Sequence, residues 1–196
     1  MVYVLEDLLN GFEIHEQIRS ISNQAAPIIF YFMVYSLFGW LLENTHSYFT
    51  RGYFLKPNFW FGPFKPMYGF APLILIYSIS KEPHWVVVLI LCFFVPTIVE
   101  YLSGIMLENL FHQKWWDYSG NRLNFQGHIC LTYSVYWAIL SYLCISYIHP
   151  LITYTYTKIE FFFYFAWTFI AVYFLVETFL AIWRHTLQDK SVESSG

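Results

Sequence analysis

The chain has 196 residues, of which 58% are hydrophobic and only 12% are charged. Soluble domains carry about 25% charged residues, and the apolar residues of this chain lie in runs long enough to cross a bilayer, so the composition excludes an ordinary soluble domain and predicts an all-α polytopic membrane bundle. The net charge of −3 and the lack of a basic run give no support for a nucleic-acid partner.

The N-terminal segment, residues 1–25, is acidic and carries apolar residues at helical spacing. This pattern predicts an amphipathic helix at the membrane interface, with a partly ordered tail of helical propensity as the alternative. Residues 23–27 break the pattern and predict the end of that helix. No small-residue cleavage site follows an apolar core, so we expect no cleavable signal peptide.

Five apolar segments predict a bundle of about five transmembrane helices over residues 26–184, followed by a polar C-terminal tail at 185–196. The segments are residues 26–42, 66–80, 85–106, 129–148 and 161–183. The second is short for a bilayer that needs about 20 residues, and Gly69 and Pro72 interrupt it. Irregular backbone is tolerated in a membrane only against protein or a wet cavity, so we expect this segment to line the bundle interior.

Basic residues are distributed unequally between the two ends of such a bundle. One end collects Arg51, Lys56, Lys65, Lys114, Arg122, Arg184 and Lys190, and the other collects Arg19, Lys81 and Lys158. The positive-inside bias places the first end in the cytoplasm. The sequence therefore predicts a multi-pass protein of the cell membrane with its N-terminus outside, its C-terminus in the cytoplasm and its two polar loops on the cytoplasmic face.

The longest polar run in the chain's interior, residues 108–130, separates the third and fourth apolar segments. Its paired tryptophans, Trp115 and Trp116, suit interfacial anchors, and residues 119–121 (Ser-Gly-Asn) give a turn signal. We therefore expect the loop to fold back over the membrane face and to carry Asn124 and His128 toward Glu108. A mobile connector is the alternative.

Asp117 follows the two tryptophans in this loop. A partly buried carboxylate needs a cation or several hydrogen-bond donors, so we expect Arg51 or Arg122 to pair with Asp117.

Acidic residues also lie at and inside the predicted helix ends. Glu43 and Glu108 end the first and third segments, and Glu100 lies about 12 Å deeper than Glu108, with Gly104 between them. A carboxylate inside a bilayer normally faces the bundle interior and a partner, which predicts a polar pocket open to the cytoplasm. In the alternative interpretation Glu43 and Glu108 only cap helix ends, and Glu100 alone is buried.

Known catalytic patterns are missing from the sequence, which has no GxSxG, HExxH or Walker lysine motif. The three cysteines, Cys92, Cys130 and Cys144, form no CxxC pair, and the loop histidines match no strong zinc template. The sequence therefore predicts no cofactor and no metal, and it leaves enzymatic activity undecided, with a non-enzymatic role favoured.

Six motifs, taken together, resemble a known family. They are GWLLE (39–43), RGYF (51–54), GPFKPMYGFAPL (62–73), EYLSGIMLE (100–108), WWDYS (115–119) and NFQGHICL (124–131). The set covers roughly residues 33–150 and resembles the bacterial family described as putative ABC-transporter permeases of type IV, CmpB-like. WWDYS followed by N-x-x-G-x-I-C-L is the most specific part of the resemblance.

The resemblance implies a permease or transport component of an ABC-type transporter in the lipid bilayer. Because the chain has no nucleotide-binding motif, ATP hydrolysis would require an ATPase on a separate chain. The small number of spans implies either an assembly of several copies or a small substrate-capturing subunit. The candidates for the pocket are Glu43, Arg51, Tyr68, Glu100, Glu108, Trp116, Asp117, Asn124 and His128. Two further functions stay open, namely an intramembrane enzyme that acts on a lipid headgroup or another amphiphile, and a membrane assembly factor.

Overall fold

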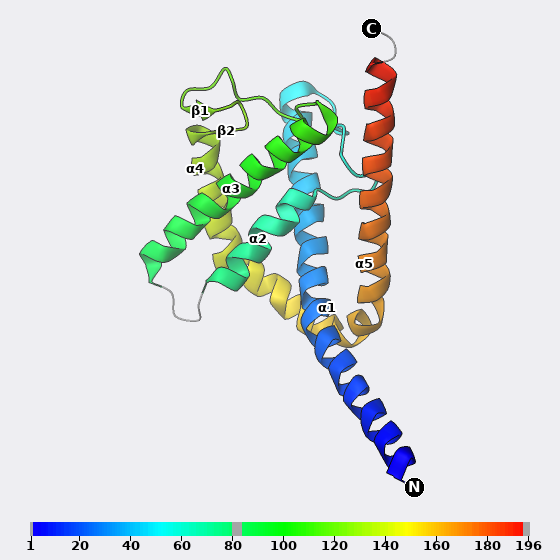
Figure 1. Cartoon of the computed structure of the whole chain (residues 1–196). Coiled ribbons are helices and arrows are strands. Elements are labelled where there is room, and N and C mark those ends of the chain that lie inside the picture. The colour runs from blue at the N-terminus through cyan, green and yellow to red at the C-terminus, as the bar shows by residue number, and fades with distance from the viewer. Residues whose placement is uncertain (1, 80–83, 194–196) are drawn as a thin grey trace.

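The computed structural model describes the backbone of residues 2–79 and 84–193, and the side chains of residues 20–79 and 84–187. The described chain is all-α apart from a short two-stranded ladder (Figure 1). Its elements are α1 (Val2–Arg51), α2 (Pro66–Ser78), α3 (Trp85–Phe111), β1 (Asn124–Phe125), β2 (Ile129–Cys130), α4 (Leu131–Leu143), the π-helical turn η1 (Cys144–Ile148) and α5 (His149–Glu193).

α1 is a continuous helix, so the predicted break at residues 23–27 is wrong, as is the predicted end of the first apolar helix at residue 42. Pro27 cannot donate to the carbonyl group four residues earlier. One face of the adjoining turns is nevertheless buried, with Ala26 2% and Phe30 4% exposed, so tertiary packing holds the helix across the proline. Residues 2–25 are helical, but the side chains of residues 1–19 lie outside the described set, and the amphipathic face stays a prediction.

α2 begins at the predicted Pro66 and continues regularly through Gly69 and Pro72, so the expected irregular backbone is wrong. Gly69 serves close packing instead, because a Cβ there would lie 2.5 Å from the Phe32 ring and from Ser36 Oγ on α1. Gly39 on α1 likewise leaves room for the Tyr68 ring of α2. The glycines therefore set a close crossing of α1 and α2.

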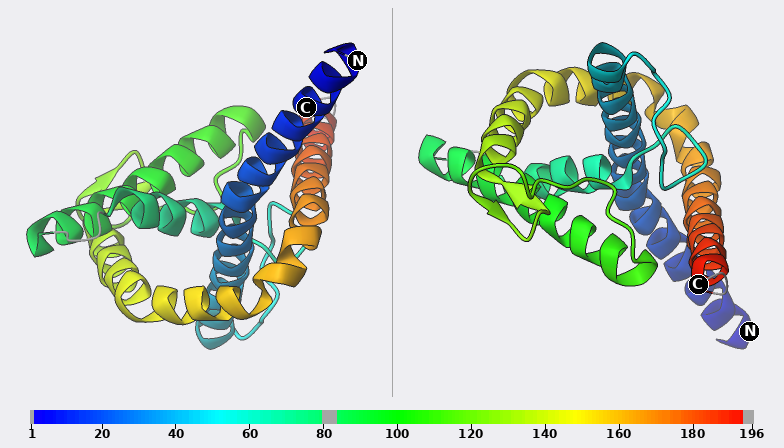
Figure 2. Two further views of the ribbon diagram at one scale, coloured as in Figure 1. Left: turned by 90° about the horizontal axis from the view of Figure 1, so that it is seen from below. Right: turned by 90° about the horizontal axis from the view of Figure 1, so that it is seen from above.

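The predicted connection between the last two apolar segments, residues 149–160, is helical, which corrects the expected boundaries of both. The fourth helix also begins later than predicted, because residues 129 and 130 form β2. The π-helical η1 and Pro150, early in α5, are features at which helices bend. Figures 1 and 2 show α4 running away from the polar loops and the path curving through η1, after which α5 returns to the loop end.

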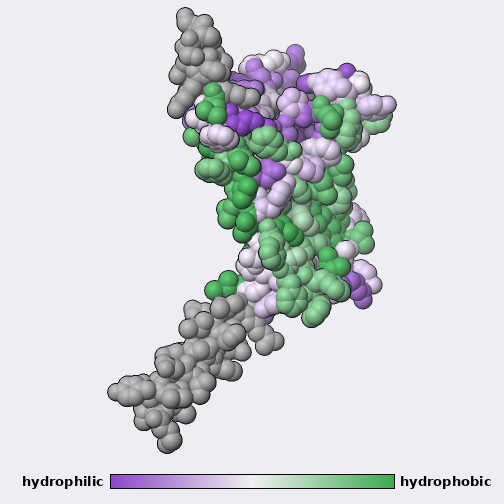
Figure 3. Space-filling view, turned by 90° about the vertical axis from the view of Figure 1, so that its right-hand side faces the viewer, coloured by the Kyte–Doolittle hydropathy of each residue, from purple (hydrophilic) through white to green (hydrophobic). Residues whose placement is uncertain are grey.

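The two polar loops, residues 52–65 and 112–130, lie at the same end of the molecule, as expected (Figure 1). α5 also ends there, whereas α1 begins at the opposite end. Three helical stretches among the described residues are long and apolar enough to cross a membrane: Ser20–Arg51, Trp85–Phe111 and Leu131–Leu187. On the face seen in Figure 3, a belt of hydrophobic side chains lies below the polar surface of the loop end, as a membrane protein requires.

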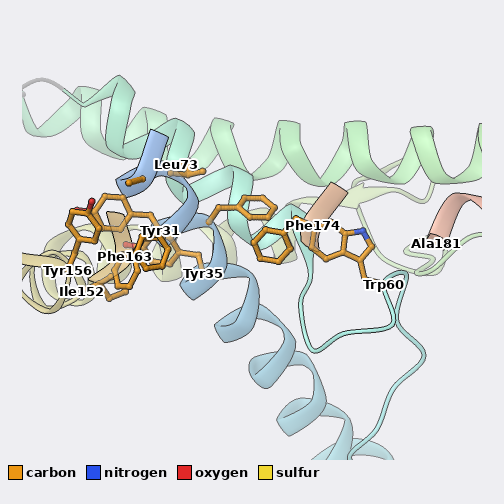
Figure 4. Packing of buried hydrophobic residues seen from close by; sticks show 12 residues of the cluster. Tyr31, Tyr35, Trp60, Leu73, Ile152, Tyr156, Phe163, Phe174 and Ala181 are labelled. Atoms are coloured by element: carbon orange, nitrogen blue, oxygen red, sulfur yellow. The ribbon is translucent and has the colours of Figure 1, made fainter. Parts of the chain in front are cut away.

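The buried core joins α1 to α5 and is largely aromatic (Figure 4). Phe30 packs edge-on against Phe163, with ring centroids 5.2 Å apart. Trp60, from the first loop, stacks on Phe174 of α5, also at 5.2 Å. This core therefore fixes the first loop to the helices as well as the helices to each other.

Candidate functional site

A partly buried cluster of charges forms where the first loop meets the end of α1. Glu43 Oε2 accepts hydrogen bonds from the ammonium groups of both Lys56, at 2.8 Å, and Lys65, at 2.7 Å. Burial lowers the pKa of Lys65 below its usual value, and the adjacent Glu43 carboxylate opposes this shift. Two cations therefore share one carboxylate oxygen, and each ammonium group keeps further N–H donors for other partners.

Backbone contacts hold the first loop in position beside this cluster. The fully buried Asn44 accepts a hydrogen bond from the Lys56 amide through Oδ1 at 2.8 Å and donates through Nδ2 to the Trp40 carbonyl. The Lys65 amide donates to the Ser36 carbonyl at 3.0 Å. Both lysines are thus positioned by their own backbone as well as by Glu43.

α5 supplies a second set of anchors for the same loop. The Glu177 carboxylate is 7% exposed and accepts the amides of Phe61 and Gly62, at 2.9 and 3.0 Å. The Arg184 guanidinium donates to the carbonyl groups of Asn58 and Phe59 and lies over the Phe61 ring. These polar residues of α5 therefore organise the loop through its backbone.

The second loop folds back on itself, as predicted. The Tyr118 amide donates to the Gly127 carbonyl and the Trp116 indole donates to the His128 carbonyl, both at 2.8 Å. The β1–β2 ladder closes the reversal, with Asn124 opposite Cys130. Gly127 has a φ of 75°, a conformation that glycine adopts without steric cost.

Asp117 does not have the partner predicted for it. Its carboxylate is exposed and accepts hydrogen bonds from the amide and hydroxyl of Ser119, which lower its pKa below 3.8. Within the described part of the chain it forms no ion pair with Arg51 or Arg122. The turn itself satisfies Asp117, so no cation is needed.

Glu108 does meet His128, as expected. His128 is 4% exposed, and its Nε2 lies 2.9 Å from Glu108 Oε2. Gly104 makes room for this contact, because a Cβ there would lie 2.7 Å from His128 Nδ1. Asn124 instead remains within the loop, where its side-chain amide donates to the carbonyl groups of Ser119 and Asn121.

Glu100 is buried in the interior of the bundle, 2% exposed. Its Oε1 accepts a hydrogen bond from the Tyr118 hydroxyl at 3.0 Å. Burial raises the pKa of Tyr118, so this hydroxyl keeps its proton and acts as the donor. The Glu100 carboxylate and the indole N–H of Trp137 interact with each other. The geometry of this contact is poor, and Glu100 Oε2 and Trp137 Nε1 have no well-formed hydrogen bond among the described residues.

Two cavities meet at Glu100. The larger of the two, called the vestibule below, has a volume of about 1110 Å³ and lies between the two loops and the adjoining ends of α1, α2, α3 and α4. The Glu43–Lys56–Lys65 cluster lines it together with many aromatic and apolar side chains. The apolar chamber, about 490 Å³, lies deeper, among α1, α2, α3, α4 and η1. Six residues line both cavities and form the boundary between them, which we call the neck: Leu42, Met67, Tyr68, Glu100, Trp137 and Leu140.

The candidates chosen from the sequence divide between two places. Six of them line the vestibule, namely Glu43, Arg51, Tyr68, Glu100, Trp116 and Asp117. The other three, Glu108, Asn124 and His128, stabilise the second loop and lie outside the lining of either cavity.

Sequence reasoning did not select Lys56, Tyr118 and Trp137, which line the vestibule, and it considered Lys65 only as a positive partner for the acidic residues. Lys56 and Lys65 carried a usable signal, because they are basic residues in a loop that is otherwise aromatic and rich in proline and that follows an acidic helix end. Tyr118 and Trp137 carried none, because aromatic residues are common along the whole chain.

Comparison with known proteins shows which family this chain belongs to. The family model described as "Putative ABC-transporter type IV" (ABC_trans_CmpB) matches residues 30–182. The chain belongs to this CmpB-type family. No match was found among curated proteins or among solved structures.

The region shared with the CmpB-type family contains both loops and every residue that lines the two cavities. It begins inside α1, after Pro27, and ends inside α5, just before Arg184. The helical N-terminal extension and the last turns of α5 lie outside it. The site therefore belongs to the part of the chain that defines the family.

Proposed function

We propose that this chain is the membrane-embedded component of an ABC-type transporter and that the vestibule is its substrate entrance. The observation that carries the proposal is Glu100, a carboxylate 2% exposed that borders both cavities. An acid at membrane depth is costly unless it serves a pathway or a binding site. Membership of the CmpB-type family supports the transport role, and the lack of a nucleotide-binding motif calls for an ATPase on another chain.

The proposed topology has five crossings, with α1, α2, α3, α4 and α5 each crossing once. α2, with 13 residues, is too short to span a full bilayer. We propose that it crosses beside the cavity, where the hydrocarbon thickness to be spanned is smaller. The path of α4, η1 and α5, out and back, supports counting the long helical stretch Leu131–Leu187 as two crossings. The basic residues of the two loops support a cytoplasmic location for the loop end.

An intramembrane enzyme is less well supported by the arrangement of acid–base groups. General acid–base catalysis needs the reacting groups within reach of one substrate position. Glu108 and His128 pair with each other outside the cavity linings, and Asp117 is engaged by its own turn. A binding and transport role uses the cavities as they are, without requiring these groups to move.

Purification from native membranes tests the proposal. The tagged full-length chain should carry an ATPase subunit with it, and the complex reconstituted in nanodiscs should hydrolyse ATP. Glu100→Gln, which keeps the size of the side chain, should retain the subunit but lose at least about tenfold of the ATPase activity. Glu160→Gln, an exposed position on α5, is the control and should behave like the wild type. Full activity of Glu100→Gln, or the absence of any ATPase from the purified material, would contradict the proposal.

A further inference from the structure

The two cavities differ in chemistry along one path. The apolar chamber is walled by hydrocarbon and aromatic side chains from five elements, including Phe38, Ala71, Leu75 and Val99. The vestibule above it carries charged side chains and is bounded by the polar loops. A solute that fills both must therefore be polar at one end and apolar at the other.

The charges at the polar end are not evenly distributed. The cations that line the vestibule are Arg51, Lys56 and Lys65, and the acids are Glu43, Glu100 and Asp117. Asp117 is exposed and engaged by its turn, and Glu100 lies deeper, at the neck. Beside the buried ammonium group of Lys65 and the partly buried one of Lys56 only Glu43 remains, so this point holds two cations against one carboxylate.

Such a point favours an anionic partner. Each ammonium group has three donors, and Glu43 Oε2 takes one from each lysine. The remaining donors can reach phosphate or carboxylate oxygens, which form strong charge-assisted hydrogen bonds.

We propose that the substrate is an anionic amphiphile with a single hydrocarbon chain, whose acidic head binds Lys56 and Lys65 and whose chain occupies the apolar chamber. This inference rests on the proposed function, in which the vestibule admits the substrate. The neck offers one acceptor, Glu100 Oε2, and one donor, the Trp137 N–H, neither of which has a partner of good geometry among the described residues. A hydroxyl group between head and chain can donate to the first and accept from the second.

Binding to the purified full-length chain in detergent tests the proposal with three probes. Palmitoyl lysophosphatidic acid carries both the anionic head and the chain, glycerol phosphate carries the head alone, and monopalmitoylglycerol carries the chain with a neutral head. We expect lysophosphatidic acid to bind at least about tenfold more tightly than either of the others, because only it engages both ends of the site.

Variants separate the two ends of the site. Lys65→Gln should weaken lysophosphatidic acid at least about tenfold, and Lys65→Arg should retain most of the affinity. Ala71→Phe and Ser141→Phe, each of which fills the chamber from a different helix, should weaken lysophosphatidic acid at least about tenfold and leave glycerol phosphate unchanged. Lys158→Gln and Val172→Phe, both outside the cavity linings, are the matched controls. Thermal unfolding of each variant checks that it is folded.

Each contrary outcome identifies what is wrong. Equal binding of monopalmitoylglycerol would overturn the anionic head, and equal binding of glycerol phosphate would overturn the hydrocarbon chain. If Lys65→Gln and both chamber-filling variants bind lysophosphatidic acid as tightly as the wild type does, the ligand binds elsewhere. If no probe binds while an ATPase still copurifies and Glu100→Gln still loses activity, the substrate class fails and the transport role stands. If the probes bind as expected but no ATPase copurifies, the transport role fails.

Discussion

Asp117 illustrates how a single turn can replace a distant partner. Its carboxylate takes two hydrogen bonds from Ser119, and Gly127 leaves room for it on the other side, since a Cβ there would lie 2.6 Å from Asp117 Oδ1. The exposed acid therefore links the start of the second loop to its end without an ion pair.

The second loop should consequently loosen in acid. The Ser119 donors lower the pKa of Asp117 below its usual 3.8, so ionised Asp117 stabilises the folded loop above that pH, and this contribution is lost as the pH falls through the lowered pKa. Hydrogen exchange, corrected for its intrinsic pH dependence, should show a loss of protection of the loop as the pH falls from about 5 toward about 3. Asp117→Asn should be less protected at about pH 5 and should show no such loss. Identical profiles for the two proteins would rule out this role.

At the scale of elements, Glu177 ties α5 to the first loop. Glu177→Ala leaves the amides of Phe61 and Gly62 without their acceptor, which should cost about 2 kcal/mol of unfolding free energy. Limited proteolysis should then cut residues 52–65 faster than in the wild type. Glu177→Gln keeps one acceptor oxygen, so its stability and its rate of proteolysis should lie between those of the wild type and of Glu177→Ala. Glu160→Ala, on the exposed side of α5, is the control. Unchanged proteolysis of Glu177→Ala would mean that Arg184 and the core suffice to hold the loop.

The crossing of α1 and α2 depends on a missing side chain at Gly39. Gly39→Ala places its Cβ inside the space of the Tyr68 ring, so Tyr68 must shift, at an expected cost of about 1–3 kcal/mol in unfolding free energy. Gly120→Ala, in the second loop, meets no atom within 4 Å and should change the stability by less than about 0.5 kcal/mol. Thermal unfolding in detergent compares the two. Equal stabilities of Gly39→Ala and Gly120→Ala would show that α1 and α2 can accommodate the added Cβ without a cost in free energy.

The same elements show what the sequence could predict. Apolar runs located the starts of α2 and α3, because Pro66 and Trp85 follow polar, turn-forming residues. They could not show that residues 149–160 stay helical, since the reversal of the path arises from η1, Pro150 and packing against α1, and a hydropathy pattern records none of these.

The sequence predicted how deep the acidic residues of α3 lie, but not toward which neighbour each of them points. Glu100 and Glu108 are eight residues apart, which leaves them about 80° apart around the helix. That angle turns Glu100 toward the cavities and Glu108 toward His128 of the second loop. A sequence without its neighbouring helices does not say which of two such acids faces the interior.

For the whole molecule, the proposed five crossings fix the side on which each connection lies. The two polar loops share one end of the structure with the end of α5, and the end of α2 and the start of α3 lie away from them (Figure 1). From the basic residues of the loops and the positive-inside bias, we propose that this shared end lies in the cytoplasm. The topology thus requires opposite accessibility for the loops and for the α2–α3 connection.

Labelling of single cysteines can test this topology in intact cells. Leu55 and Leu123 lie at exposed positions in the two loops, and His84 lies at an exposed position just before α3. In a background in which Cys92, Cys130 and Cys144 are replaced by serine or alanine, His84→Cys should react with a membrane-impermeant maleimide from outside the cell. Leu55→Cys and Leu123→Cys should react only after the membrane is opened, because the bilayer separates them from the reagent. Reaction of all three positions from the same side would contradict a crossing by α2 and α3, and labelling with the sides exchanged would keep the five crossings but reverse the proposed orientation.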